Sequence, residues 1–220
     1  MEALFLTLKL AFVSTLILLV LATPLAWCLA HKSFKGKALL EAFLALPLVL
    51  PPTVLGFYLL IALGPNGPGG AIASLWGGTS LAFSFTGLLI GSVIYSFPFV
   101  VQPLQNGFIL IGEKPLQVAA TLKASFFDAF TSVIIPLAKP AYISAATLGF
   151  AHTLGEFGVV LMIGGNIPGE TQVVSIAIFE NVETMQYGQA HFLSGILLLI
   201  SFTLLAVIYR NRQKSQSGLL

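Results

Sequence analysis

The chain has 220 residues, of which ten are Lys or Arg and eight are Asp or Glu. Charged residues make up 8% of the chain, against roughly 25% in an average soluble domain, while hydrophobic residues make up 57%. Such a chain cannot cover a water-facing surface with polar groups, which excludes a soluble enzyme and a disordered chain. The net charge of +2 is too small for a nucleic-acid binder. We therefore expect an all-α, polytopic membrane protein.

Metal and nucleotide sites are absent from the sequence pattern. The only cysteine is Cys28, so a disulfide within the chain is impossible, and no metal-ligand spacing occurs. The stretch 107–112 has the glycine spacing of a phosphate-binding loop, but Glu113 stands where that loop requires Lys. The sequence predicts no metal and no cofactor bound by this chain.

Five apolar segments are long enough to cross a membrane. About 20 helical residues span a hydrocarbon core of about 30 Å. The five segments, in chain order, are roughly 10–30, 39–63, 81–110, 141–163 and 192–209. We expect one transmembrane domain over 1–220, with its core at about 7–210 and a short cytoplasmic tail at 211–220.

Basic residues predict the orientation of these spans. Nine of the ten follow the first, third and fifth spans: Lys32, Lys35, Lys37, Lys114, Lys123, Lys139, Arg210, Arg212 and Lys214. The connections on the other side, 64–80 and 164–191, contain no Lys or Arg. Because basic residues concentrate in cytoplasmic loops, the N-terminus is predicted outside and the C-terminus in the cytoplasm.

The second span contains three prolines, Pro47, Pro51 and Pro52, next to Thr53. Proline removes a backbone hydrogen bond and kinks or breaks a helix. Broken backbone at membrane depth is tolerated only inside protein or beside a water-filled cavity. The prolines therefore favour a segment that lines a pathway, and a static kink used for packing is the alternative.

The connection 113–140 has the pattern of ordered structure. Pro115 suits the first turn of a helix over 116–123, and Ser125 and Asp128 have capping-box spacing for a second helix. An apolar stripe follows at helical spacing: Phe126, Phe130 and Val133 or Ile134. This segment is interpreted either as a helical knob that docks into a cytoplasmic partner or as a re-entrant piece packed on its own domain.

Glu156 is the only acid in the central part of a predicted span, and His152 precedes it by four residues. In a continuous helix the two side chains share a face. Three interpretations remain open for the pair: a structural hydrogen bond, part of an outer gate, or a catalytic pair in an intramembrane enzyme. An anion pathway would offer hydroxyls instead, for which Ser92 and Ser96 are candidates.

The sequence resembles a known family at Gln117-Val-Ala-Ala-Thr-Leu-Lys-Ala-Ser125 followed by Ile135-Pro136-Leu137. This pattern is similar to the EAA loop of permeases in binding-protein-dependent ABC importers, with Gln117 in place of Glu and Lys123 or Ala124 in place of Gly. In that family the loop is a coupling helix that sits in a cleft of the ATPase. The resemblance thus implies an ATPase-coupling role for Gln117, Ala119, Ala120, Thr121, Lys123, Ala124, Ser125 and Phe126.

Two further blocks narrow the resemblance, which covers about residues 7–210. The first block is 46–56, and the second is 153–158 with 165–171. Both are similar to sequences of the molybdate permease branch of the family. Sulfate/thiosulfate or tungstate transport by the same family is the alternative. The resemblance implies a pathway or gate made by Pro47, Pro51, Pro52, Thr53, His152, Thr153 and Glu156. It also implies a binding-protein-facing loop that contains Asn166, Pro168, Gly169 and Glu170.

The same resemblance implies the assembly. We expect a homodimer in the bacterial inner membrane, in contact with membrane lipids and without nucleic acid. Two cytoplasmic ABC ATPase subunits would use ATP and Mg²⁺, so this chain is not an enzyme by itself. A periplasmic or lipid-anchored oxyanion-binding protein would deliver molybdate, and transport would proceed by alternating access.

Overall fold

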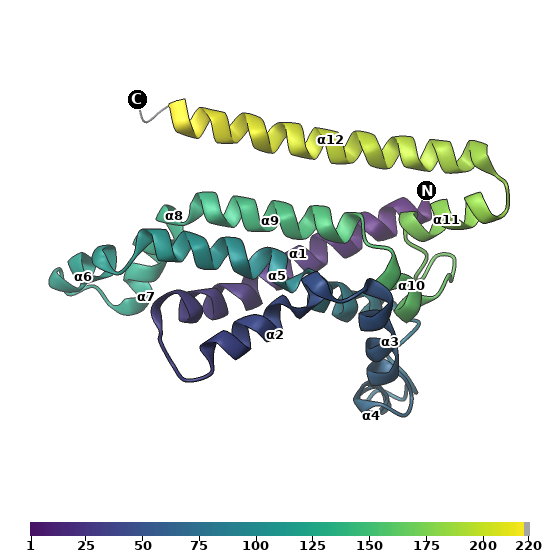
Figure 1. The fold of residues 1–220 in the computed structure, drawn as a ribbon, viewed down its shortest axis with the longest axis horizontal. Coiled ribbons are helices and arrows are strands. Elements are labelled where there is room, and N and C mark those ends of the chain that lie inside the picture. The colour runs from purple at the N-terminus through teal and green to yellow at the C-terminus, as the bar shows by residue number, and fades with distance from the viewer. Residues whose placement is uncertain (218–220) are drawn as a thin grey trace.

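The computed structural model of the chain describes residues 1–217, and for 207–217 it describes the backbone only. Within this part of the chain the regular structure is helical, with one π-helical turn, η1, and no strand (Figure 1). The elements are α1 (Glu2–His31), α2 (Lys37–Val49), α3 (Pro52–Leu63), α4 (Pro68–Ser74), α5 (Phe85–Ile111), α6 (Lys114–Thr121), α7 (Phe126–Ala129), η1 (Phe130–Ile134), α8 (Ile135–Leu137), α9 (Lys139–Leu154), α10 (Gly158–Gly164), α11 (Val174–Glu183) and α12 (Tyr187–Ser217).

The five-span prediction agrees with the structure if each bent helix pair counts as one span. Helices α1 and α5 and the part of α12 up to Ala206 are each long and apolar enough to cross a membrane. Helices α2 and α3 form a pair bent by 110°, and the segment 126–137 forms a pair with α9 bent by 71°. The N-terminus and the far end of α12 lie at opposite ends of the molecule (Figure 1).

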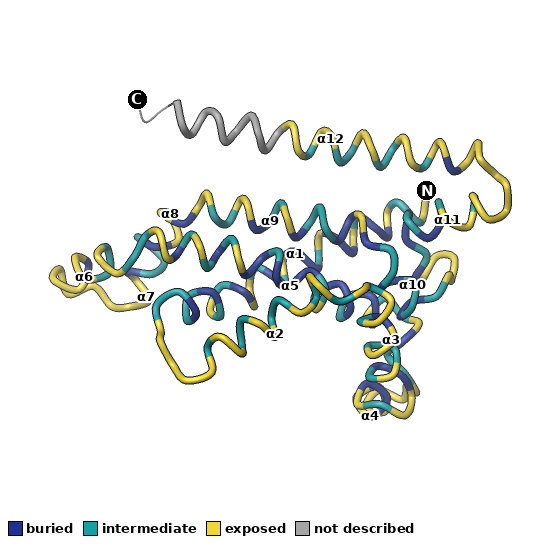
Figure 2. The backbone as a smooth tube through the Cα atoms, in the orientation of Figure 1, coloured by how far each residue is buried: buried dark blue, intermediate teal, exposed yellow. Residues whose placement is uncertain are grey.

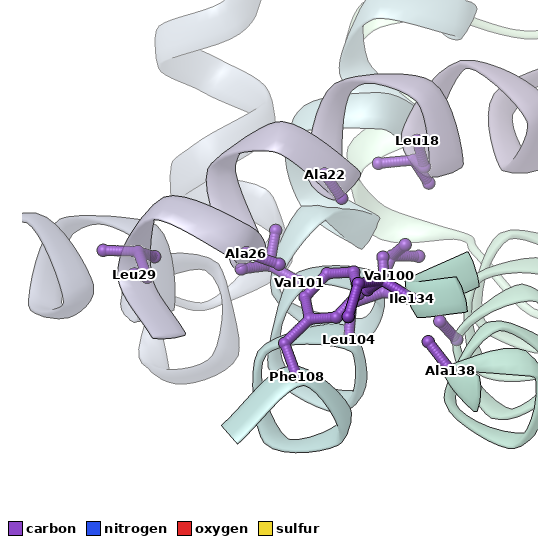
Figure 3. Packing of buried hydrophobic residues seen from close by; sticks show 11 residues of the cluster. Leu18, Ala22, Ala26, Leu29, Val100, Val101, Leu104, Phe108, Ile134 and Ala138 are labelled. Atoms are coloured by element: carbon purple, nitrogen blue, oxygen red, sulfur yellow. The ribbon is translucent and has the colours of Figure 1, made fainter. Parts of the chain in front are cut away.

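Helices α1, α5 and α9 pack against one another and form the core. Ala22 and Ala26 of α1 are fully buried in one cluster with Leu104 of α5 (Figure 3). Gly149 of α9 lies so close to α5 that a Cβ atom added there would be 2.6 Å from Val100 Cγ2. Lipid tails are as apolar as these side chains, so van der Waals packing between small residues stabilises such an interface.

The second span is two helices rather than one kinked helix. Helix α2 contains Pro47 and ends at Val49, and α3 begins at Pro52. Leu50 is extended, with φ −68° and ψ 135°, because the residue before a proline avoids the helical region. The predicted break is confirmed, and its 110° angle turns α3 away from the direction of α2.

The prediction of one continuous helix over 141–163 is wrong. Helix α9 ends at Leu154 and α10 begins at Gly158. Two glycines, Gly155 and Gly158, flank the break, and each costs about 1 kcal/mol in a helix interior relative to Ala. The freed carbonyl of Glu156 accepts a hydrogen bond from the Ser175 hydroxyl at 2.5 Å, which satisfies a polar group that the membrane cannot solvate.

The last helix, α12, packs against α11 and exposes most of its described side chains (Figure 2). Only 6% of its most apolar stretch is buried. The predicted tail at 211–220 continues the helix as far as Ser217, and 218–220 lie outside the described residues. The connection predicted at 64–80 is partly helical, because α4 lies within it.

Candidate functional site

A cavity of about 620 Å³ lies where the two broken spans meet. Pro52 and Thr53 of α3, Tyr95 of α5, His152 of α9 and Glu156 of the break line it. Four of these, all except Tyr95, belong to the predicted pathway set. The structure thus brings together residues that are 100 positions apart in the sequence.

Three other members of the predicted pathway set lie outside the lining of this cavity. Pro47 is inside α2, and Pro51 immediately precedes α3. Thr153 is buried, and its hydroxyl is 3.0 Å from the Ser96 hydroxyl of α5. Pro47 and Pro51 thus shape the bend, and Thr153 fastens α9 to α5.

Glu156 connects three elements at the break in the fourth span. Its side chain is 4% exposed; the Ser92 hydroxyl of α5 donates to Oε2 at 2.5 Å, and Oε1 has no hydrogen-bond partner among the described residues. Its backbone carbonyl accepts a hydrogen bond from the Ser175 hydroxyl of α11. The structural hydrogen bond is present. Glu156 lies beyond the end of α9, so the prediction that it shares a helix face with His152 is wrong.

His152 is held by α5 through stacking and a hydrogen bond. Its ring stacks on Phe99 with 3.8 Å between ring centroids and lies 4.6 Å from the Tyr95 ring. Its Nδ1 is 2.9 Å from the Ser96 hydroxyl. Tyr95 and Phe99 were not predicted from the sequence; their spacing of four residues on α5 was the available signal.

The polar pairing differs from that of a catalytic pair. Ser92 pairs with Glu156, and Ser96 pairs with His152. Each of the two candidate side chains thus has its own serine on α5. The Ser92 and Ser96 hydroxyls, which were predicted as candidate donors to an anion, are thus already paired with Glu156 and His152.

The segment 113–140 forms the helices that the sequence predicts. Pro115 lies in the first turn of α6, and Ser125 caps α7. The Ser125 hydroxyl accepts from the Asp128 backbone N–H at 3.1 Å and donates to the Asp128 carboxylate at 2.7 Å. These local bonds order the segment, which lies at one end of the molecule beside α1 (Figure 1).

Most of the predicted coupling residues of this segment are exposed. The exposed members are Gln117, Ala120, Thr121, Lys123, Ala124, Ser125 and Phe126. Ala119 is the exception, with 7% exposure, so it packs the segment and presents no surface to a partner. Lys123 has a φ of +62°, a left-handed conformation that favours glycine. Lys123, rather than Ala124, thus corresponds to the Gly of the family pattern.

Aromatic contacts join this segment to the core. The Trp27 ring of α1 is 5.2 Å from both the Phe108 ring of α5 and the Phe130 ring of η1, measured between ring centroids. Phe126 stacks on Phe130 at 5.9 Å. These rings pack the segment directly against α1 and α5.

The loop between α10 and α11 lies at the opposite end of the molecule (Figure 1). Its predicted partner-facing residues are all exposed: Asn166, Pro168, Gly169 and Glu170. Thr171 organises the loop, because its hydroxyl donates to the Gly164 carbonyl at 2.6 Å and accepts from the Ile167 N–H at 3.2 Å. The loop is thus both ordered and accessible.

Comparison with known proteins places this arrangement in a family. Residues 8–214 match the model of the binding-protein-dependent transport system inner membrane component. The chain belongs to this family. The permease is 55% identical over 213 residues to the molybdenum transport system permease protein ModB of Azotobacter vinelandii, which covers 97% of this chain and 94% of that relative.

A more distant relative and a solved structure also match the chain. The permease is 35% identical to a probable sulfate transport system permease protein cysT of Chlorella vulgaris, over 94% of this chain and 77% of that relative. The fold matches the structure of a bacterial alginate ABC transporter in complex with an alginate-bound periplasmic protein, with a TM-score of 0.73 and 15% identity over 94% of this chain and 76% of that chain.

Replacing Glu156 by Leu should lower the unfolding temperature of the permease, because Ser92 loses its buried partner. A buried polar group left unpaired costs about 1–3 kcal/mol, which corresponds to about 2–12 °C in a chain of this size. Thermal unfolding of the purified protein in detergent measures the change. Glu156→Gln keeps an acceptor for Ser92 and should retain most of the stability.

The same two variants separate a fastening role from a gating role for Glu156. If Glu156→Leu unfolds at the wild-type temperature, the carboxyl group does not fasten the break to α5. If Glu156→Gln also leaves solute uptake unchanged, the gate interpretation fails.

Proposed function

We propose that the chain is the membrane-spanning permease subunit of an ATP-driven molybdate importer. The observation that carries this proposal is the 55% identity to the A. vinelandii molybdenum permease along nearly the whole of both chains. The identity to the sulfate permease is lower, at 35%, so sulfate is the second candidate within the same family.

We propose a pair of these subunits with the pathway between them. The cavity at the broken spans is lined from α3, α5, α9 and the break, and Thr53 at its wall is exposed. Polar groups at membrane depth face protein or a water-filled cavity rather than lipid. A second copy placed against this face would enclose the cavity and shield it from lipid.

Two ATPase subunits would bind the exposed α6–α7 segments and hydrolyse ATP with Mg²⁺. Coupling requires that ATP bind one global state of the complex more tightly than the other. The aromatic contacts among Trp27, Phe108 and Phe130 offer a route by which movement of the segments reaches the core. Alternating access then exposes the pathway first to one side and then to the other.

The positions of charge support the proposed orientation. The connection 32–37, which contains three Lys, lies at the same end of the molecule as α6 and α7 (Figure 1). The segment 114–139, which includes α6 and α7, contains three more Lys. We place this end in the cytoplasm and the N-terminus outside. The ordered loop with Asn166 and Glu170 would then face an oxyanion-binding protein, either periplasmic or lipid-anchored.

Reconstitution tests the proposal. The permease, its ATPase and its binding protein are placed in liposomes, and uptake of radiolabelled molybdate is measured with and without ATP, in competition with sulfate. We expect ATP-dependent molybdate uptake that a hundredfold excess of sulfate leaves largely intact. Sulfate uptake without molybdate uptake would assign the second candidate, and flux without ATP would indicate a channel.

A further inference from the structure

Three carboxamide side chains lie on one face of α5, near its predicted cytoplasmic end. Gln102, Gln105 and Asn106 are spaced i, i+3 and i+4, which places them together on a helix. Gln102 and Asn106 are exposed, and Gln105 is half-buried. At about 1.5 Å per residue, Gln102 is about 14 Å from the Ile111 end of the helix, well inside the span.

Exposed amides at this depth need polar surroundings. Polar side chains inside a membrane face the bundle interior or a water-filled cavity, because lipid offers them no hydrogen bond. All three carboxamides line a second cavity, of about 480 Å³, between α5 and α2. This cavity is separate from the one at the broken spans, and the sequence analysis did not anticipate it.

The far wall of this second cavity comes from α2. Glu41 of α2 accepts a hydrogen bond from the Gln105 amide at 2.7 Å, and Ala42, Leu44 and Ala45 complete the wall. Helix α2 has no buried residue of its own. Its half-buried Leu40 and Leu44 pack against the core, and the cavity between α2 and α5 has one polar side, formed by Glu41 and the three carboxamides.

The two cavities follow one another along the same face of α5. Tyr95 lines the first cavity, and Pro98 and Gln102 line the second. These positions are spaced i, i+3 and i+7, so they lie within one stripe of the helix surface. On the other side α3 lines the first cavity and α2 lines the second, so the bend at 50–52 lies between them.

We propose that the second cavity is an oxyanion-binding station on the cytoplasmic half of the transport pathway, with the carboxamide N–H groups of Gln102, Gln105 and Asn106 as its donors. The inference rests on the proposed function, which supplies the oxyanion. An oxyanion such as molybdate only accepts hydrogen bonds, and each carboxamide offers two N–H donors.

The composition of the station suits passage rather than storage. Its donors are neutral, so they supply hydrogen bonds without the strong attraction of Lys or Arg. The Glu41 carboxylate occupies one donor of Gln105, and its negative charge opposes a second anion. A pathway conducts when its sites bind strongly enough to admit the ion and weakly enough to release it.

The test measures ATP-driven molybdate uptake by the reconstituted complex that carries Gln102→Glu with Asn106→Asp. These changes keep the size of each side chain and replace its N–H donors with anionic oxygens. We expect uptake to fall at least tenfold while the binding protein still stimulates ATP hydrolysis. Gln102→Asn keeps the donors and should retain more than half of the uptake.

The matched control is Gln189→Glu, which makes the same substitution at an exposed carboxamide in the first turn of α12 and should leave uptake unchanged. Wild-type uptake in the double variant would overturn the station. A second double variant, Gln102→Leu with Asn106→Leu, tests whether the amides serve subunit packing. If neither double variant assembles with the ATPase, the amides serve packing and the station is overturned. Absence of molybdate uptake by the wild-type complex would instead refute the proposed function.

Discussion

Replacing Phe126 by Asp is expected to reduce ATP-driven uptake at least tenfold. Phe126 lies at the start of α7 and is 62% exposed, although its ring also stacks on Phe130. The same segment also exposes Val118, Leu122 and Phe127. Several large exposed apolar side chains on one ordered segment are typical of a protein–protein contact, and a charge there would have to be desolvated on docking. Co-purification of the ATPase with the permease measures docking, and uptake in proteoliposomes measures coupling.

The control for this experiment is Phe34→Asp, the same substitution at a 43% exposed Phe in the connection between α1 and α2. The control should bind the ATPase normally. Ala120→Asp tests the same docking surface at a second exposed position, whereas Ala119→Asp is unsuitable because Ala119 is buried. Normal co-purification and normal uptake in both Phe126→Asp and Ala120→Asp would contradict the docking role.

Replacing Gly158 by Val is expected to abolish most uptake by forcing α10 away from α3. A Cβ atom added at Gly158 would lie 2.8 Å from the Pro52 ring, and one added at Gly56 would lie 2.8 Å from Met162 Cβ. Such overpacking costs about 1–3 kcal/mol, or about 2–12 °C in unfolding temperature for a chain of this size. Because Pro52 lines the cavity at the broken spans, the wall of the proposed pathway should move with it.

Gly195→Val is the matched control for this prediction. Gly195 lies in the apolar part of α12 and has no atom within 4 Å of an added Cβ, so the variant should unfold and transport like the wild type. Thermal unfolding and uptake are measured on both variants. A Gly158→Val protein with wild-type stability and uptake would show that α3 and α10 can separate without consequence.

The sequence predicted those features that depend on neighbouring residues. Ser125 and Asp128 are three positions apart, so their capping bonds could be anticipated, and the break before Pro52 follows from proline geometry. The break at Gly155 was missed, because the apolar pattern on either side of it is that of one continuous span. It depends on support from Ser92 and Ser175, which are far away in the sequence.

The candidate site was predictable in composition but not in arrangement. His152 and Glu156 stood out because ionisable residues are rare inside a membrane. Their pairing with Ser96 and Ser92 arises from the packing of α9 and the following break on α5, for which a single sequence carries no direct signal. The carboxamides of α5 were overlooked because they are uncharged, although Gln102, Gln105 and Asn106 are spaced to share one face of the helix.

The two arms of the second span differ in mechanical compliance. Helix α3 is clamped to α10 through close glycine contacts at Gly56 and Gly158. Helix α2 has no fully buried residue; the half-buried Leu40 and Leu44 and the bond between Glu41 and Gln105 hold it to the core. A load applied at the α6–α7 end of the molecule should therefore be absorbed mainly as deflection of the soft arm, α2, while the stiff arm, α3, keeps its place.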